Sequence, residues 1–249
     1  MMKLTLAEPK FLKESVNIIS DLVNDINIKV DSDGLQVIAM DPANVALIDF
    51  RLLSSAFSEY EVEGSLEISI SLEGLKSIMK RAKPSDSILL AYDKGDNRLK
   101  VELVGGSKRS FSIPLINLDA SEQRIPSLKF STRVDMPSEQ FDEAVEDVSI
   151  IAESVALKVK DGRFYINSEN NLSEASVELP STESISVKTD GEDVMARYSM
   201  DYLKKMIKGS KIADSVSIEF NKDYPVRVSY TVTDKVHLSF ILAPRVSND

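Results

Sequence analysis

The sequence has no cysteine, a single histidine and no long hydrophobic run. Without cysteine, the chain has no disulfide, no thiolate nucleophile and no thiolate ligand for a metal. The one histidine, His237, would need a nucleophile arranged beside it for catalysis, and no nucleophile motif is present. We therefore expect no catalytic residue, no metal and no cofactor. A carboxylate-dependent metal hydrolase is the enzyme alternative, because the chain has 40 acidic residues.

No stretch of the sequence approaches the length of a membrane span, and the first residues, MMKLTLAEPK, lack the apolar core of a signal peptide. We therefore expect an intracellular protein. The formal net charge of −10 argues against a protein whose whole surface grips nucleic acid or an anionic membrane. It is compatible with a local basic face.

The sequence contains two copies of one folding unit. The segment from Leu75 to Ile88 recurs as the segment from Leu203 to Val216, with identical leucine, lysine, aspartate and serine residues at an offset of 128. This offset is about half of the 249 residues, which predicts two similar domains. We place them at residues 1–116 and 132–249, joined by a polar linker at residues 117–131.

The apolar periodicity and the turn residues predict the same order of elements in both domains. Each domain begins with a strand and a helix, continues with five strands and a second helix, and ends with three strands. Asp33-Gly34 and Asp161-Gly162 predict hairpins, and Ser71 can cap the second helix. Short strands joined by tight turns are mostly antiparallel, so the predicted fold class is α+β. The helices are expected at about residues 9–24, 72–83, 138–153 and 200–210.

The second helix of each domain carries lysines on the side opposite its apolar residues. Lys76, Lys80 and Lys83 follow the i, i+4, i+7 spacing that places them on one side, and their counterparts repeat this pattern in the second domain. A charged outer face is typical of any amphipathic helix. Two matching stripes in an acidic chain nevertheless favour an anionic ligand.

The helix expected at residues 138–153 has no basic residue, whereas a basic cluster lies in the other domain. Opposite charges in opposite halves suit a head-to-tail contact between neighbouring chains, and such contacts close into rings when the rotation permits. The acidic residues of this helix include Glu139, Glu143, Glu146 and Asp147, and the basic cluster comprises Lys80, Arg81, Lys83, Lys108 and Arg109.

Four segments carry a resemblance to a known family. They are LQVIAMDPANVALIDFRL at 35–52, IPSLKF at 125–130, MPSEQF at 136–141 and FILAPRV at 240–246. With these segments in this order and with its duplicated domains, the chain resembles the sliding clamps of the proliferating-cell nuclear antigen (PCNA) type, and most of all the archaeal ones.

The resemblance implies the DNA-clamp fold, in which three subunits join head to tail into a trimeric ring and twelve helices line its hole. Twelve helices about 10 Å apart need a circumference of roughly 120 Å, which leaves a hole of about 28 Å. Such a hole admits duplex DNA with water around it, so enclosure rather than tight contact would hold the ring on DNA. By the family pattern, the lysines that line the hole are Lys10, Lys13, Lys76, Lys80, Lys204, Lys205, Lys208 and Lys211.

The family pattern also implies a groove for partner proteins that carry a short motif of glutamine and aromatic residues. Apolar anchors beside a flexible linker fit the capture of such a peptide. The matching residues are Met40, Asn44, Val45, Leu47, Ile125, Pro126, Phe130, Pro225, Ile241, Ala243 and Pro244.

A further implication of the resemblance is a strand pair between neighbouring subunits. The last strand of the first domain, around 109–113, would pair with the neighbour's strand around 175–179, which would protect two open sheet edges. The apolar residues of this contact are Phe111, Ala175, Val177 and Leu179. The resemblance also implies its charged residues, which are Glu139, Glu143 and Asp147 on one side and Arg81, Lys83, Lys108 and Arg109 on the other.

The sequence thus predicts a DNA polymerase processivity factor with no catalysis of its own. We expect a homotrimer that encircles duplex DNA and tethers DNA polymerase, a flap nuclease and a ligase, and that needs a clamp loader. It would act in the cytoplasm, in association with the nucleoid. The alternative among binding proteins is one subunit of a heterotrimeric clamp.

Overall fold

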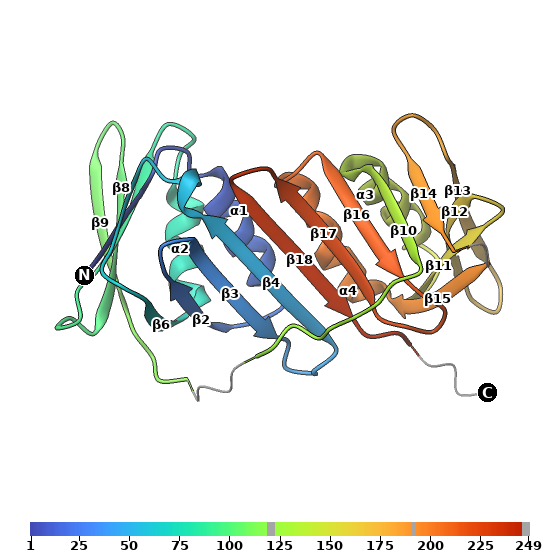
Figure 1. Cartoon of the computed structure of the whole chain (residues 1–249), viewed down its shortest axis with the longest axis horizontal. Coiled ribbons are helices and arrows are strands. Elements are labelled where there is room, and N and C mark those ends of the chain that lie inside the picture. The colour runs from blue at the N-terminus through green and yellow to red at the C-terminus, as the bar shows by residue number, and fades with distance from the viewer. Residues whose placement is uncertain (119–122, 191–192, 246–249) are drawn as a thin grey trace. The chain divides into compact units, whose positions relative to one another are not determined.

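The computed structural model describes residues 1–118, 123–190 and 193–245, and the chain forms two compact units (Figure 1). The first unit comprises Met1–Pro42, Ile48–Ile125 and Val232–Leu238. The second unit comprises Ala43–Leu47, Pro126–Thr231 and the residues from Ser239 onward. Each unit therefore includes a short segment from the other half of the sequence.

Both halves of the sequence follow the predicted order of strand, helix, five strands, helix and three strands, which confirms the duplication. Before the linker the elements are β1 (Met2–Leu6), α1 (Lys10–Ile19), β2 (Asp25–Val30), β3 (Gly34–Met40), β4 (Ala46–Leu53), the 3-10 helix η1 (Ser54–Ala56), β5 (Glu59–Val62), β6 (Leu66–Ser71), α2 (Leu72–Arg81), β7 (Ser87–Tyr92), β8 (Arg98–Val104) and β9 (Lys108–Pro114). After it they are β10 (Thr132–Pro137), α3 (Ser138–Val148), β11 (Ser154–Lys160), β12 (Arg163–Glu169), β13 (Glu174–Pro180), β14 (Ser186–Thr189), β15 (Val194–Ser199), α4 (Met200–Met206), the 3-10 helix η2 (Ile207–Lys211), β16 (Ser215–Phe220), β17 (Val226–Val232) and β18 (Val236–Leu242).

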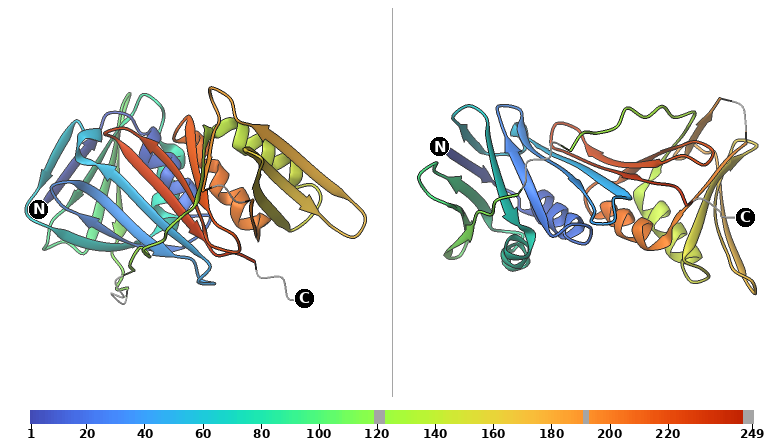
Figure 2. Two further views of the ribbon diagram at one scale, coloured as in Figure 1. Left: turned by 45° about the vertical axis from the view of Figure 1, so that its right-hand side comes forward. Right: turned by 90° about the horizontal axis from the view of Figure 1, so that it is seen from below.

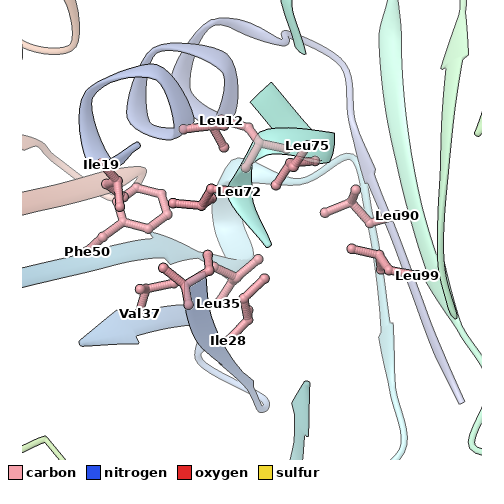
Figure 3. A pocket seen from close by; sticks show the side chains of 12 residues that line it. Leu12, Ile19, Ile28, Leu35, Val37, Phe50, Leu72, Leu75, Leu90 and Leu99 are labelled. Atoms are coloured by element: carbon pink, nitrogen blue, oxygen red, sulfur yellow. The ribbon is translucent and has the colours of Figure 1, made fainter. Parts of the chain in front are cut away.

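Two groups of strands and two helices build the core of the first unit. One sheet has the hydrogen-bonded order β5-β1-β7-β8-β9, and the other group has the order β4-β3-β2-β6. Helices α1 and α2 lie beside each other and bury their apolar sides (Figure 2). Leu12 of α1 and Leu75 of α2 point into a narrow apolar space that Val37 of β3 and Leu90 of β7 also line (Figure 3). The helices thus join both groups of strands in one core and keep their polar sides outside it.

The second unit repeats this plan with different side chains. Its strands have the orders β13-β12-β11-β15 and β14-β10-β16-β17-β18. Phe141 and Val145 of α3 and Leu203 and Met206 of α4 are buried against them. The strand pairs whose register is resolved in both units are antiparallel, as the sequence predicted. No helix in the described residues is long and apolar enough to cross a membrane.

All four helices end earlier than the sequence predicted: α1 ends at Ile19, α2 at Arg81, α3 at Val148 and α4 at Met206. Lys83 therefore lies just beyond the helix to whose lysine face it was assigned. Beyond Ile19 the chain continues in tight turns, in which Asp21 N donates to Ile18 O and Leu22 N donates to Ile19 O. Leu22 is still buried. The apolar periodicity therefore extends past the last helical turn, which is why it overestimated the helix.

The predicted capping role of Ser71 is wrong in its detail. Ser71 occupies the N-cap position of α2 with an extended backbone, but its hydroxyl makes no capping hydrogen bond, and the same holds for Ser199 before α4. At the other end of α4, the chain continues as η2, which contains Gly209. A Cβ at position 209 would lie 2.3 Å from ring atoms of Tyr230, so only glycine allows this close packing.

The two predicted hairpins are present, and their glycines have different tasks. Asp161 and Gly162 both have positive φ, at 50° and 71°, which is the combination that a two-residue type I′ turn needs. Gly34 has a φ of 153° and opens β3. A Cβ at position 34 would lie 2.4 Å from Leu52 O, so this glycine is required by the close approach of the β4 backbone.

The buried side of α1 contains one polar side chain at a position where α3 has an apolar one. Ser15 is fully buried, and in the described structure its hydroxyl has no hydrogen-bond partner. The equivalent position of α3 is Ala144, which is also buried. We expect Ser15→Ala to raise the free energy of unfolding by about 1 kcal/mol, because it removes an unsatisfied buried hydroxyl and improves helix propensity. Urea unfolding followed by circular dichroism measures this.

The matched control for Ser15→Ala is Ser20→Ala at the end of the same helix. The Ser20 hydroxyl donates to Asn17 O at 2.8 Å, so its removal should leave stability unchanged or lower it. A Ser15→Ala variant that unfolds at a lower urea concentration than the unsubstituted protein would contradict the assignment of an unsatisfied hydroxyl.

Candidate nucleic-acid interface and peptide groove

The predicted DNA-facing lysines of the first unit differ in what they contact. Lys76 Nζ lies 3.1 Å from Asp21 Oδ1, and Lys13 Nζ donates to Ala82 O at 3.0 Å. Lys10 and Lys80 are exposed. All four belong to α1 or α2, the two helices that lie beside each other. The lysine contacts with Asp21 and Ala82 were not visible in the sequence, because each joins residues more than 50 positions apart.

The lysines of the second unit follow a related pattern. Lys204 Nζ lies 3.1 Å from Glu146 Oε2 and 3.3 Å from Ser149 Oγ. Lys205 Nζ lies 5.2 Å from the centroid of the Tyr202 ring, which is a cation–π distance. Lys208 of η2 is half-buried and Lys211 is exposed. Lys76 and Lys204 are equivalent in the repeat, and each forms an ion pair with a carboxylate near the end of the adjacent helix.

The two units differ most in their first helix. Glu139, Glu143 and Asp147 of α3 are exposed, as the sequence pattern indicated, and α3 has no basic residue. In α1, Lys13 donates to the last turn of α2. Its counterpart in α3 is Asp142, which instead accepts a hydrogen bond from Ser210 Oγ at 2.8 Å. The repeat therefore keeps this tertiary contact while it reverses the charge.

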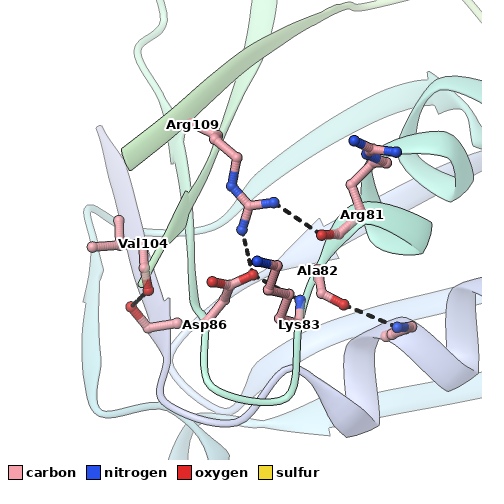
Figure 4. A network of polar contacts seen from close by, with 8 residues as sticks. Arg81, Ala82, Lys83, Asp86, Val104 and Arg109 are labelled. Carbon is pink, nitrogen blue, oxygen red and sulfur yellow. Dashed lines mark hydrogen bonds and ion pairs between the residues drawn. The ribbon is translucent and has the colours of Figure 1, made fainter. Parts of the chain in front are cut away.

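Two of the basic residues assigned to the subunit contact are neutralised within their own chain. Arg109 donates through Nη2 to the buried carboxylate of Asp86 and through Nη1 to Arg81 O at 3.0 Å (Figure 4). Asp86 Oδ2 also accepts from Lys83 N at 2.7 Å. The bond from Lys83 N, together with the Arg109 guanidinium, holds the pKa of Asp86 below its usual value.

Lys108 is the second such residue. Its Nζ lies 2.9 Å from Glu102 Oε2, and Lys100 Nζ lies 2.9 Å from Glu102 Oε1. The hydrogen bonds from Lys108 and then Lys100 lower the pKa of Glu102 to about 2. The side chains of Arg81 and Lys83 are exposed. Lys108 is exposed as well, although its charge is paired with Glu102.

The strands assigned to the subunit contact are both edge strands. β9 is the last strand of its sheet in the first unit, and β13 is the last strand of its sheet in the second. Phe111 of β9 is half-buried, and so are Ala175, Val177 and Leu179 of β13. β13 thus presents three partly covered apolar side chains and β9 presents one, beside backbone groups on the open side of each strand.

Most of the predicted groove residues belong to the second unit. Val45 O accepts a hydrogen bond from Ala243 N at 2.9 Å, which joins the segment before β4 to the end of β18. Leu47 and Ile241 are buried, whereas Asn44 is exposed and has a positive φ of 58°. Pro126, Phe130, Pro225, Ala243 and Pro244 also belong to this unit, while Met40 and Ile125 belong to the first.

The described residues contain no group of three or more histidine or acidic side chains that could hold a metal ion. The features that could bind a partner are surfaces and not a metal site. They are a lysine-bearing pair of helices, an open strand edge and an apolar segment next to the linker. These features fit binding to a polyanion and to other proteins.

Comparison with known proteins identifies the family. Residues 1–123 match the family model described as proliferating cell nuclear antigen, N-terminal domain, and residues 124–245 match the corresponding C-terminal domain. The DNA polymerase sliding clamp of Nanoarchaeum equitans is 35% identical over 98% of this chain and 99% of its own length. The DNA polymerase sliding clamp of Pyrococcus furiosus is 33% identical over 95% of both chains.

A solved structure extends the comparison to the fold. PCNA from Thermococcus kodakaraensis superposes with a TM-score of 0.92 at 25% sequence identity, over 98% of this chain and 100% of that one. The resemblance seen in the sequence segments is therefore confirmed in sequence and in structure. The chain belongs to the proliferating cell nuclear antigen family and has its clamp fold.

Proposed function

We propose that this protein is a DNA sliding clamp, a ring of three copies that encircles duplex DNA and tethers DNA polymerase to it. Relatives named DNA polymerase sliding clamp match almost the whole chain. The observation that carries the proposal is the repeat itself, since each unit places a lysine-bearing helix next to a second helix on the outside of its core. Three copies of such a chain supply the twelve helices of the hole.

The repeat also supports the head-to-tail contact. Within one chain, β4 hydrogen bonds to β18: Leu53 N donates to Lys235 O, and Ala243 N donates to Val45 O. In the repeat, β13 is the counterpart of β4, and β9 is the counterpart of β18. Because β9 and β13 are open edges, the same pairing between two chains would complete both sheets.

Burial along these strands agrees with this pairing. Phe240 of β18 is fully buried, whereas Phe111 at the equivalent position of β9 is half-buried. Phe50 of β4 is buried, whereas Val177 of β13 is half-buried. A neighbouring strand would cover the exposed part of both side chains, and exposed Arg81 and Lys83 would then meet the acidic residues of α3.

The charges of the helices suit a ring that slides. Lys76 and Lys204 are each paired with a carboxylate of their own chain, so the surface toward DNA is only mildly positive. Weak attraction to many phosphates holds duplex DNA near the axis without fixing a register. Catalysis is not part of this function. A closed ring needs an ATP-driven loader to pass onto circular DNA.

Partner enzymes would be held through the groove of the second unit, in which an extended peptide could place apolar side chains against Ile241, Pro225 and the linker. The partners that we propose are DNA polymerase, the clamp loader, a flap nuclease and a ligase. Each would carry a short motif of glutamine and aromatic residues.

Topological retention on DNA tests the function. We expect native mass spectrometry of the purified chain to give a trimer. We expect this trimer to stay on linear duplex whose ends are blocked with streptavidin after threading, even at a salt concentration that abolishes electrostatic binding. Cutting the duplex with a restriction enzyme should release it. A chain that remains monomeric and forms rings only with paralogous chains would instead indicate a heterotrimeric clamp, and salt-sensitive retention would contradict enclosure.

A further inference from the structure

The end of the linker is held by one side chain, Asn221, in the turn between β16 and β17. Its Oδ1 accepts hydrogen bonds from Ser131 N at 2.5 Å and from Ser131 Oγ at 2.7 Å. Its Nδ2 donates to Lys129 O at 2.7 Å. Both polar ends of the amide are thus used on the two residues that flank Phe130 in the linker.

Phe130 is fixed from a second direction. Its ring meets the Tyr224 ring edge to face, with centroids 6.0 Å apart, and the Arg227 guanidinium carbon lies 4.9 Å from its centroid. Arg227 is itself oriented by Glu219, with 3.6 Å between Nη1 and Oε2. Aromatic and cation–π contacts of this kind add to the hydrogen bonds of Asn221.

This attachment lies beside the proposed groove. Residues 126–131 run across β17 and β18 on the face of the sheet away from α3 and α4 (Figures 1 and 2). On that same face of β18, Ser239 and Ile241 are buried, although residues on the outer face of a sheet are usually exposed. Pro225 comes one residue after Tyr224. The linker end therefore lies beside the apolar surface that we propose for a peptide.

We propose that Asn221 is a positioning residue of the partner groove: it anchors the linker so that one wall of the groove is already in place before a peptide arrives. This inference rests on the proposed function. A wall that is ordered in advance spares the bound peptide the entropy cost of ordering it. Asn221 would then set the affinity for partners without contacting them.

A role for Asn221 only within the β16–β17 turn would predict hydrogen bonds other than those observed. If its amide only stabilised the β16–β17 turn, it would bond to backbone groups of that turn. The hydrogen bonds of its side chain go to the linker instead. Removing the amide should therefore release the linker and leave the turn, the fold and the trimer as they are.

The experiment compares Asn221→Ala with the unsubstituted protein in peptide binding and in tryptic cleavage of the linker. The probe is a fluorescent synthetic peptide with glutamine and aromatic residues, followed by polarisation. We expect Asn221→Ala to weaken the peptide about tenfold, because three hydrogen bonds no longer order the groove wall. We expect trypsin to cut after Lys129 about tenfold faster. The thermal midpoint and the trimer mass should not change.

Lys222→Ala is the matched control, since Lys222 is the exposed neighbour of Asn221 in the same turn. It should bind the peptide and resist trypsin like the unsubstituted protein. Ser131→Ala removes only one of the three hydrogen bonds, so its affinity and its cleavage rate should fall between those of the unsubstituted protein and of Asn221→Ala. This variant tests the inference even if Asn221→Ala lowers the thermal midpoint.

The outcomes separate the two proposals. If the unsubstituted trimer does not bind the peptide, the groove itself is refuted. If the unsubstituted trimer binds it and Asn221→Ala binds it equally well, the anchoring role is overturned while the groove stands. Faster cleavage with unchanged affinity would likewise overturn the inference, because the linker would then be free without any effect on the groove.

Discussion

Reversing the charge of Lys76, Lys80, Lys204 and Lys208 to glutamate should lower polymerase stimulation by more than tenfold and leave the trimer intact. The physical reason is that DNA in the hole would meet a negative wall, so threading and sliding would work against repulsion. The measurement is primer extension on a primed circular template with loader, polymerase and increasing salt. Native mass spectrometry of the same samples reports the trimer.

These four lysines differ in how strongly we expect them to attract DNA. Lys76 and Lys204 are already paired with Asp21 and Glu146, so their substitution also places two carboxylates side by side. Lys80 is exposed, and it should therefore contribute more per residue to the attraction of DNA than Lys76. A second set with glutamine in place of glutamate removes the charges without the repulsion, and it should give a smaller loss of stimulation.

The control variant for the charge reversal has the same change in net charge, but its substitutions lie outside the helices. It reverses four exposed lysines in strands and turns, which are Lys94, Lys160, Lys188 and Lys222. We expect this control to stimulate the polymerase like the unsubstituted protein. Equal losses in the two quadruple variants would assign the effect to net charge and would remove the helices from the mechanism.

Much of the fold was predictable because the sequence contains two copies of the same domain. Apolar periodicity gave the order of elements in both halves, and Asp161-Gly162 marked a hairpin whose turn needs two positive φ angles. The helix ends were less accessible. Leu22 remains buried after α1 has ended, so a burial pattern alone cannot show where the hydrogen bonds change.

The candidate site was less predictable than the fold, because sequence spacing shows which face a side chain occupies but not what it meets. Lys76 was placed correctly on the polar side of α2, yet its partner Asp21 comes from the end of another helix. Arg109 was assigned to the contact with a neighbouring subunit. It also forms an ion pair with a buried aspartate of its own chain, which no local pattern around position 109 indicates. Asn221 gave no signal in the sequence at all.

Asp86→Asn should lower the urea midpoint by about 1 M at neutral pH and should weaken the trimer. Asp86 is the buried acceptor for both Lys83 N and the Arg109 guanidinium, so its loss leaves a half-buried cation without its counter-charge. Arg109 also donates to the end of α2 from the edge strand β9. Loosening it should disturb the edge that we propose for the subunit contact, which sedimentation velocity measures.

The pH dependence of this effect has a defined sign. The pKa of Asp86 is lowered in the folded chain, first by the hydrogen bond from Lys83 N, so its charged form stabilises the fold. The stabilisation by the charged carboxylate is fully present above pH 3.8, the usual aspartate pKa. It is lost as the pH falls through the lower pKa that Asp86 has in the folded chain. The midpoints of the unsubstituted protein and Asp86→Asn should therefore converge below that pH, and parallel curves down to the acid limit would contradict the assignment.

A double variant decides whether Arg109 acts within its subunit or across the contact. The equivalent of Arg109 in the repeat is Leu238, which is fully buried. Replacing both partners of a buried ion pair with apolar groups costs much less than removing one, so Asp86→Ala with Arg109→Leu should unfold at a higher urea concentration than Asp86→Ala alone. If Arg109 acts only inside its chain, this double variant should also regain the trimer. A stable double variant that stays monomeric would show that the guanidinium belongs to the subunit contact, as its place in the sequence first indicated.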